Sequence, residues 1–138
     1  MRSGRAGAAL GAALAFGAAA AAVPGPAEDY VLHCSGCHQH DGTGVPNLVP
    51  PLSDLAPFLA TPEGRAYLVR VPGVAQAALD DERLATLLNW VLREMSGKAP
   101  DPAYDAREVH ALRADPLRDA MAARRAVLGG RASIRANE

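Results

Sequence analysis

Apolar and polar positions follow a helical period over much of the chain, most clearly after Asp80, a good N-cap residue. From there to about Met95, apolar side chains recur three and four positions apart on one helical face: Leu84, Leu87, Leu88, Val91, Leu92 and Met95. The pattern predicts an amphipathic helix that ends at Ser96-Gly97.

Two shorter helices are predicted before this one. Residues 28–35 place apolar side chains at helical spacing and begin with acidic residues, which favour a helix N-terminus. Thr61 is an N-cap followed by Pro62, and the helix that they open should run to about Arg70, where Val71-Pro72-Gly73 stops it.

Two weaker helical patterns occupy the C-terminal part. Asp105 with Glu108 forms a possible capping box, and Asp115-Pro116 predicts the start of a last helix that runs towards Leu128 before Gly129-Gly130. We expect the final eight residues to be frayed. Residues 39–57 are rich in turn formers, and no strand alternation or internal repeat is found, so the predicted fold class is all-α with long loops.

The first 22 residues are typical of a secretory signal peptide and are predicted not to belong to the fold. Arg2 and Arg5 give a positive start, an alanine-rich run follows, and Ala20-Ala21-Ala22 offers a cleavage point before a proline-containing linker. An uncleaved membrane anchor is the alternative, but alanine contributes little to membrane insertion. We therefore expect export and no membrane span after cleavage.

Composition limits what the remainder can build. The chain has 138 residues, 49% of them apolar but only 4% aromatic, so one small core is expected. So short a fold has difficulty burying enough surface unless something else fills its centre, which favours a bulky apolar cofactor.

Charge divides between two regions. Residues 27–97 hold nine acidic residues and four arginines, whereas residues 98–138 hold eight basic and six acidic residues. The basic residues form no stripe, so nucleic acid is not an expected partner. The C-terminal region is predicted to be a solvated amphipathic helix, with a docking arm as the alternative.

Chemistry concentrates in Cys34-Ser35-Gly36-Cys37-His38, a C-x-x-C-H sequence that is the haem attachment signature. Two thiols at this spacing can add across the two vinyl groups of haem, and the following histidine can bind the iron. The small residues Ser35 and Gly36 let the ring edge approach the backbone closely.

Three alternatives to haem attachment fit this motif less well. A thiol oxidoreductase needs a βαβ setting, which is not predicted here. A zinc site needs four ligands, yet only His33, His40 and His110 remain and there is no second C-x-x-C. A disulfide across so short a loop would stabilise little and needs no neighbouring histidine.

Residues 28–97 resemble a small class I c-type cytochrome from a bacterium. The resemblance implies that Pro50 presents its carbonyl to the imidazole N–H of His38 and that Leu52 packs against the haem. The turn at Asp41-Gly42-Thr43-Gly44 and the helix that carries Asn89-Trp90 also match the family, and Trp90 should pack on Tyr30 or Val31.

The resemblance implies three main helices around one covalently bound haem, in a cytochrome c domain over residues 27–97. Residues 98–138 would then be a C-terminal helical extension.

The sequence departs from this family at the sixth iron ligand. The family uses a methionine followed by proline in the loop before the last helix, where this chain has Val71-Pro72, and no methionine lies between Cys37 and Glu94. The candidate replacements are Met95, His110 and Met121, or no ligand; three others are less suitable: His33, His40 and Lys98.

The sequence therefore predicts a periplasmic monohaem cytochrome c that passes single electrons between redox proteins and is not an enzyme. Cys34 and Cys37 would anchor the haem, and His38 would bind its iron. Two alternatives remain: a five-coordinate haem protein that binds or senses a small ligand, and a haem subunit of a dehydrogenase complex that docks through residues 98–138.

Overall fold

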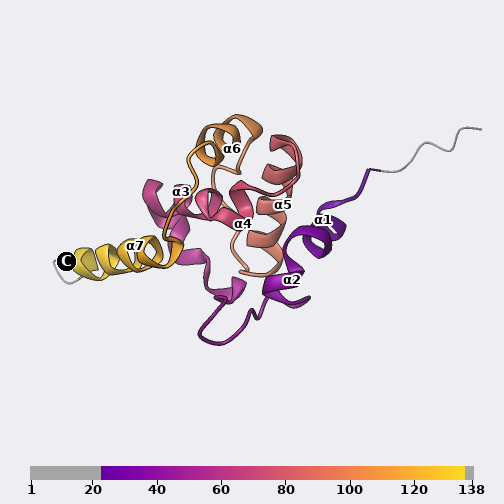
Figure 1. Ribbon diagram of the computed structural model, residues 1–138. Coiled ribbons are helices and arrows are strands. Elements are labelled where there is room, and N and C mark those ends of the chain that lie inside the picture. The colour runs from indigo at the N-terminus through magenta and orange to yellow at the C-terminus, as the bar shows by residue number, and fades with distance from the viewer. Residues whose placement is uncertain (1–22, 136–138) are drawn as a thin grey trace, which may run out of the picture.

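The computed structural model describes residues 23–135, with side chains up to residue 129, and this part of the chain is helical (Figure 1). The signal peptide predicted for residues 1–22 lies outside the described residues. The elements in chain order are α1 (Pro26–His33), α2 (Ser35–His38), η1 (Leu52–Asp54), η2 (Ala56–Ala60), α3 (Pro62–Arg70), α4 (Pro72–Ala75), α5 (Asp81–Glu94), α6 (Ala106–Arg113) and α7 (Ala120–Arg135).

The all-α prediction is confirmed for residues 23–135, where the only β pairing is an isolated bridge between Val45 and Val49. The two best-defined helices begin and end where the sequence predicted, because side chains in the sequence itself cap them. Thr61 accepts a hydrogen bond from the backbone N–H of Gly64, and Asp80 accepts one from Arg83.

Helix α5 supplies the centre of the core. Five of the six apolar residues of its predicted face are buried, and the sixth is half-buried: Leu84, Leu87, Leu88, Val91 and Leu92, with Met95 at the end of the helix. The helix packs against α1 on one side and α6 on the other. This arrangement makes residues from both ends of the chain part of a single core.

The contact between α1 and α5 combines an aromatic pair with an ion pair. The rings of Tyr30 and Trp90 have centroids 5.8 Å apart, which confirms the partner expected for Trp90, while Val31 is exposed. Beside them the buried carboxylate of Asp29 accepts a hydrogen bond from the guanidinium of Arg83. These contacts fix the N-terminal helix across α5.

A second contact of aromatic side chains joins η2 to α3. The rings of Phe58 and Tyr67 stack with centroids 4.9 Å apart and an angle of 20°. Gly64 lets the two elements approach, since a Cβ on it would lie 2.3 Å from the carbonyl oxygen of Phe58.

The C-terminal extension is built into the same core. Tyr104 is 3% exposed and Val109 is fully buried. The side-chain amide of Asn89 donates to the backbone carbonyl of Tyr104 and accepts from its N–H, both at 2.9 Å. Hydrogen bonds thus fix the segment before α6 to α5, and α6 itself adds apolar contact through Val109.

Two predictions about the chain after residue 70 are wrong. The last helix begins at Ala120 instead of after Asp115-Pro116, because Asp115 pairs with Arg70 and Asp119 accepts a hydrogen bond from the N–H of Ala122. This helix also continues through Gly129-Gly130 to Arg135, so the glycines do not end it. Of the final eight residues, which are expected to be frayed, 131–135 are helical and 136–138 lie outside the described residues.

The stop at Val71-Pro72-Gly73 needs a smaller correction. Helix α3 does end at Arg70, but Pro72 opens the additional short helix α4. Proline is well suited to a first helical position, so Pro72 both prevents α3 from continuing and begins α4.

Candidate haem-binding site

The C-x-x-C-H sequence lies at the junction of α1 and α2. Cys34 ends α1 through a hydrogen bond from its N–H to the carbonyl of Tyr30, and its own carbonyl accepts from the N–H groups of Cys37 and His38. This single turn places both sulfurs and the imidazole on one short stretch of backbone. Both cysteines are free thiols, Cys34 half-buried and Cys37 exposed.

The imidazole of His38 is oriented by the loop that follows. Its Nδ1 lies 3.1 Å from the carbonyl oxygen of Pro50, as the resemblance implies. Because a carbonyl only accepts hydrogen bonds, Nδ1 carries the proton and Nε2 is left with its lone pair. Burial lowers the pKa of His38, and the hydrogen bond to Pro50 opposes this more weakly. The neutral, metal-binding form is thereby favoured at neutral pH.

Backbone hydrogen bonds hold Pro50 in place. The N–H of Gly44 donates to the carbonyl of His38 at 3.0 Å, and the N–H of Leu52 donates to that of Gly42 at 2.8 Å. Gly44 has a φ of 69°, and a Cβ on it would lie 2.3 Å from the carbonyl oxygen of Val49. Position 44 therefore requires glycine for two reasons: its backbone angle and the closeness of the backbone at Val49.

The three motif residues open onto a cavity of about 390 Å³, within the range of small-molecule sites. All five predicted site residues line it: Cys34, Cys37, His38, Pro50 and Leu52. Apolar side chains from α3, α5, α4 and the residues that flank α4 form most of the remaining wall: Leu68, Val71, Val74, Ala77, Leu84, Leu87, Leu88, Val91 and Leu92. Thiols at the rim, an oriented imidazole and apolar walls are the donors and surroundings that a covalently attached haem requires.

The Cys34 thiol is not poised for thiol exchange. Burial raises its pKa to about 11, and Asp29 and Cys37 act in the same direction. A thiol with a raised pKa is a poor nucleophile at neutral pH, which disfavours the oxidoreductase alternative. No strand precedes it within residues 23–135.

The zinc alternative gains no support. Across the described residues, no three side chains of histidine, cysteine, aspartate or glutamate come close enough together to hold a metal ion. His33 and His40 lie next to the motif but do not line the cavity, and neither does Lys98.

Of the three candidate distal ligands, the fold places one in the cavity wall and two outside it. The sulfur of Met95 packs towards Gly42, and Met95 does not line the cavity. His110 is exposed on α6, where its Nδ1 lies 2.9 Å from a carboxylate oxygen of Asp81. Met121, in the first turn of α7, does line the cavity.

Two further lining residues were not identified from the sequence. Tyr67 lines the cavity from α3, and Arg124 does so from α7, where its guanidinium lies 4.8 Å from the centre of the Phe58 ring. The spacing of Ala120, Met121 and Arg124 along one helical face is a signal that could have grouped the α7 residues, but nothing local indicates which wall that face meets.

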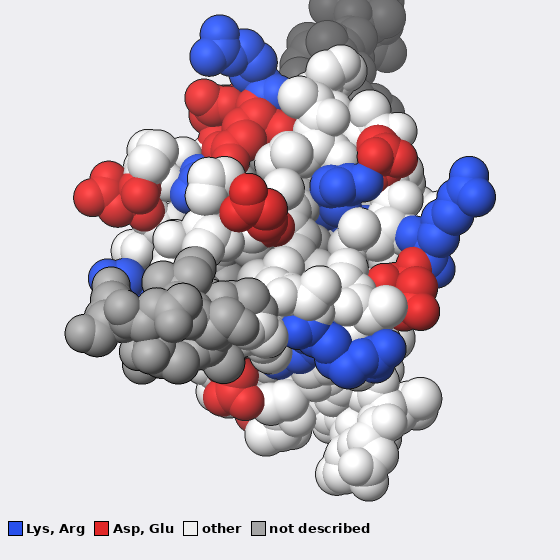
Figure 2. Space-filling view, turned by 90° about the vertical axis from the view of Figure 1, so that its left-hand side faces the viewer, with Lys and Arg blue, Asp and Glu red and all other residues white. Residues whose placement is uncertain are grey.

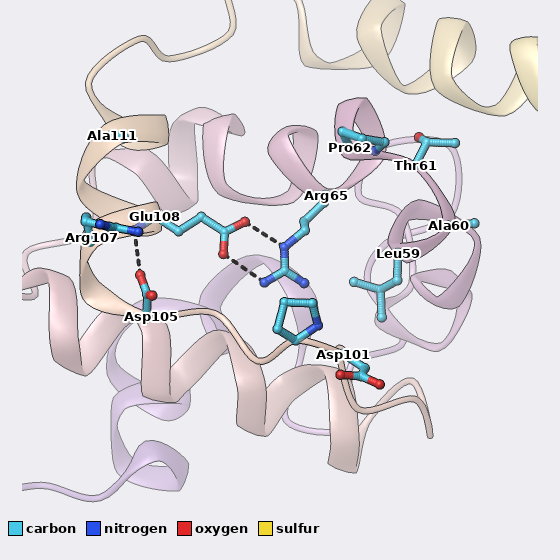
Figure 3. Close-up of a pocket in the computed structure, with 11 residues that line it drawn as sticks. Leu59, Ala60, Thr61, Pro62, Arg65, Asp101, Asp105, Arg107, Glu108 and Ala111 are labelled. Carbon is cyan, nitrogen blue, oxygen red and sulfur yellow. Dashed lines mark hydrogen bonds and ion pairs between the residues drawn. The ribbon is translucent and has the colours of Figure 1, made fainter.

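A second hollow, of about 750 Å³, lies between α3 and α6 and contains none of the motif residues. Figure 3 shows its main feature, the paired side chains of Arg65 and Glu108, with hydrogen bonds of 2.6 and 2.8 Å. Because Arg65 and Glu108 pair with each other, they join the two helices and are not free charged groups for a ligand.

The face shown in Figure 2 bears acidic and basic side chains interspersed, without a continuous basic stripe. No helix within residues 23–135 has the length and apolar content needed to cross a membrane.

An all-α fold around an apolar cavity, with C-x-x-C-H at its rim, defines a protein of the cytochrome c class. The chain is 34% identical over 109 residues to a Thermus thermophilus protein named cytochrome c-552, with 61% of this chain and 81% of that protein covered. A second cytochrome c-552 of Thermus thermophilus is also 34% identical over 109 residues, with 72% of its length covered. No family model matches. The chain belongs to the family of these small c-type cytochromes, electron carriers whose cofactor is a covalently bound haem c with its iron.

Proposed function

We propose that this protein is an exported cytochrome that carries single electrons between redox proteins in the periplasm. Cys34 and Cys37 would form the two thioether bonds to haem, and His38 would bind its iron. The single C-x-x-C-H sequence sets the number of haem groups at one.

One observation carries these assignments. Both thiols and the imidazole of His38 reach the same apolar cavity, and the 3.1 Å contact to the Pro50 carbonyl leaves Nε2 of His38 free to bind iron. A hydrogen bond of this kind fixes the orientation of a ligating histidine and raises its basicity.

Bound haem supplies one-electron chemistry, and the chain controls its surroundings. The buried side chains of Leu52, Leu68 and Leu88 give the cavity an apolar wall. Burial and apolar surroundings are among the means by which a protein sets the potential of a haem. Nothing in the cavity wall other than the motif and Arg124 is charged or strongly nucleophilic, which suits an electron carrier that turns over no substrate and is not an enzyme.

The transfer surface is assigned to the rim beside the attachment helix. Cys37 is exposed there, and Leu48, which also lines the cavity, is 74% exposed. The haem domain has a net negative charge, with nine acidic residues against four arginines in residues 27–97. A redox partner with a basic patch would be steered towards it, with a greater effect on association rate than on affinity.

The assignments are tested by expressing the full chain in a bacterium with an active periplasmic system for c-type cytochrome maturation. We expect haem that stays with the polypeptide after denaturation, a mature product that has lost residues 1–22, and reversible one-electron reduction. Cys34→Ser with Cys37→Ser should abolish covalent haem, whereas Ser35→Ala, between the two cysteines, should retain it.

Absence of covalent haem from the wild-type chain would refute the proposal. A reduced protein that is high-spin and changes its spectrum with carbon monoxide would favour the ligand-binding alternative. Native periplasmic material that elutes only as part of a larger assembly would favour the dehydrogenase subunit.

A further inference from the structure

The loop that supplies the distal methionine in related cytochromes has no ligand here. Val71, Gly73, Val74 and Ala77 face the cavity, and none of these residues has a side-chain donor atom. If the iron has a sixth ligand, another element must supply it.

The residues that line the cavity leave two candidate side chains for the sixth iron ligand. Apart from the motif, the lining residues with sulfur, imidazole or phenol donors are Tyr67 and Met121, while the guanidinium of Arg124 is a hydrogen-bond donor and not a metal ligand. Tyr67 is 7% exposed and its ring is stacked on Phe58. A phenol must also lose its proton to bind iron, whereas a thioether sulfur binds without any proton loss.

Hydrogen bonds bring the start of α7, which carries Met121, close to the loop that lacks a ligand residue. The N–H of Leu117 donates to the carbonyl of Arg70 at 2.8 Å, and Arg70 immediately precedes Val71. The guanidinium of Arg70 in turn binds the side chain and the backbone carbonyl of Asp115. These contacts tie the segment that leads into α7 to the position where the family carries its methionine.

Helix α7 also reaches the cavity from a side different from that of His38. Helix α2, with His38, and helix α7 lie on opposite sides of the view in Figure 1, and both contribute to the lining of the one cavity. The side chain of Met121 is 46% exposed and is not locked into the core. Its unbranched, flexible chain can therefore place the sulfur where a ligand requires it.

We propose that Met121, supplied by the C-terminal extension, is the distal ligand of the haem iron. The assignment rests on the proposed function, because it requires haem attached at Cys34 and Cys37 and bound by His38. It gives the extension a specific role: α7 replaces the missing loop methionine, and the iron keeps the histidine and methionine ligation that raises haem potential in cytochromes c.

Visible spectra and near-infrared magnetic circular dichroism of the full-length holoprotein test this assignment. We expect the ferric wild type to show the methionine-to-iron charge-transfer band, and Met121→Leu to lose it while keeping covalent haem. The midpoint potential of Met121→Leu should fall, and its ferrous form should bind carbon monoxide, which the wild type should not. Met121→His should exchange the methionine signature for that of two histidines.

Two variants serve as controls. Met95→Leu removes a methionine outside the cavity and Tyr67→Phe removes the phenol, and both should keep the band. The assignment is overturned if the band survives in Met121→Leu, if either control loses it, or if the wild type lacks it. Covalent haem in every variant with an unchanged band would refute only the role of Met121, whereas loss of covalent haem from the wild type would refute the proposed function as well.

Discussion

Asn89 on α5 and Tyr104 in the segment before α6 form a reciprocal pair of hydrogen bonds, side-chain amide to backbone, each 2.9 Å long. The two hydrogen bonds satisfy the backbone N–H and carbonyl of Tyr104, which is 3% exposed. The Tyr104 hydroxyl then donates to the carbonyl of Arg65 on α3 at 2.9 Å. One tyrosine thus joins the segment before α6 to both α5 and α3.

Replacing Asn89 by alanine should destabilise the protein. The N–H and carbonyl of Tyr104 would lose their partners in a buried position, which costs roughly 1–3 kcal/mol for each unsatisfied group. We expect urea denaturation of the holoprotein, followed by circular dichroism, to show a reduced free energy of unfolding. Thr86→Ala, an exposed change on the same helix, is the control, and equal stability of the two variants would contradict the assigned role.

Gly44→Ala should be more damaging than an alanine at another glycine of similar backbone angle. Gly97 has a φ of 65° with nothing within 4 Å of an added Cβ, whereas Gly44 has a φ of 69° and would bring its Cβ within 2.3 Å of the Val49 carbonyl. Gly97→Ala then measures the cost of the left-handed angle alone, about 1–2 kcal/mol.

The excess effect of Gly44→Ala reports the collision, which displaces the loop that carries Pro50. We expect a lower yield of haem-loaded protein, measured by haem absorbance per polypeptide, and a larger loss of stability than in Gly97→Ala. Equal behaviour of the two variants would show that the loop tolerates the displacement.

The sequence predicted the elements whose determinants are local. Thr61 and Asp80 cap their own helices, and the haem motif lies within five consecutive residues, so these features could be identified without tertiary information. The start of α7 could not, because Asp115 and Asp119 are both acceptable N-caps and the choice between them depends on Arg70, which is 45 residues from Asp115.

The choice of a distal iron ligand also depends on tertiary structure that the sequence does not reveal. Periodicity correctly placed Met95 on the apolar face of α5, but that face meets both the cavity and the turn at Gly42, and only the crossing of helices decides which one the sulfur reaches. Met121 was one of the candidate distal ligands, but nothing in the sequence favoured it over Met95 and His110. Its place in the cavity wall follows from hydrogen bonds between segments far apart in the chain.

Arg113→Ala should loosen the connection between α4 and α5. The guanidinium donates to three carbonyl groups of this segment, at 2.9 Å to Ala75, 2.6 Å to Ala77 and 2.8 Å to Leu79. Without it these carbonyls have no charged donor, so we expect faster amide hydrogen exchange in residues 75–79. Arg107→Ala, an exposed change on the same helix, should leave exchange in this segment unchanged. Unaltered exchange in Arg113→Ala would show that apolar contacts alone hold it.

Acid should weaken the junction of α5 and α6 through Asp81. Hydrogen bonds from His110 and Arg113 lower the pKa of Asp81 below its ordinary value. A carboxyl group with a lower pKa in the folded state stabilises the protein above its unfolded pKa of about 4, and the stabilisation is lost as the pH falls through the folded pKa.

Asp81→Asn removes this proton-linked contribution and keeps a side chain of nearly the same shape. We expect the stability of the wild type to fall more steeply than that of the variant between about pH 5 and pH 3, a range that spans the ordinary carboxyl pKa. Denaturant unfolding at a series of pH values measures the difference, and any acid release of His38 from iron cancels because both proteins share it. Glu82→Gln, which removes the exposed neighbouring carboxylate, is the control and should follow the wild type. Parallel curves for the wild type and Asp81→Asn would mean that the contacts of Asp81 with His110 and Arg113 contribute nothing to folding. The junction of α5 and α6 would then depend on its buried apolar residues and on the hydrogen bonds of Asn89 to Tyr104, just before α6.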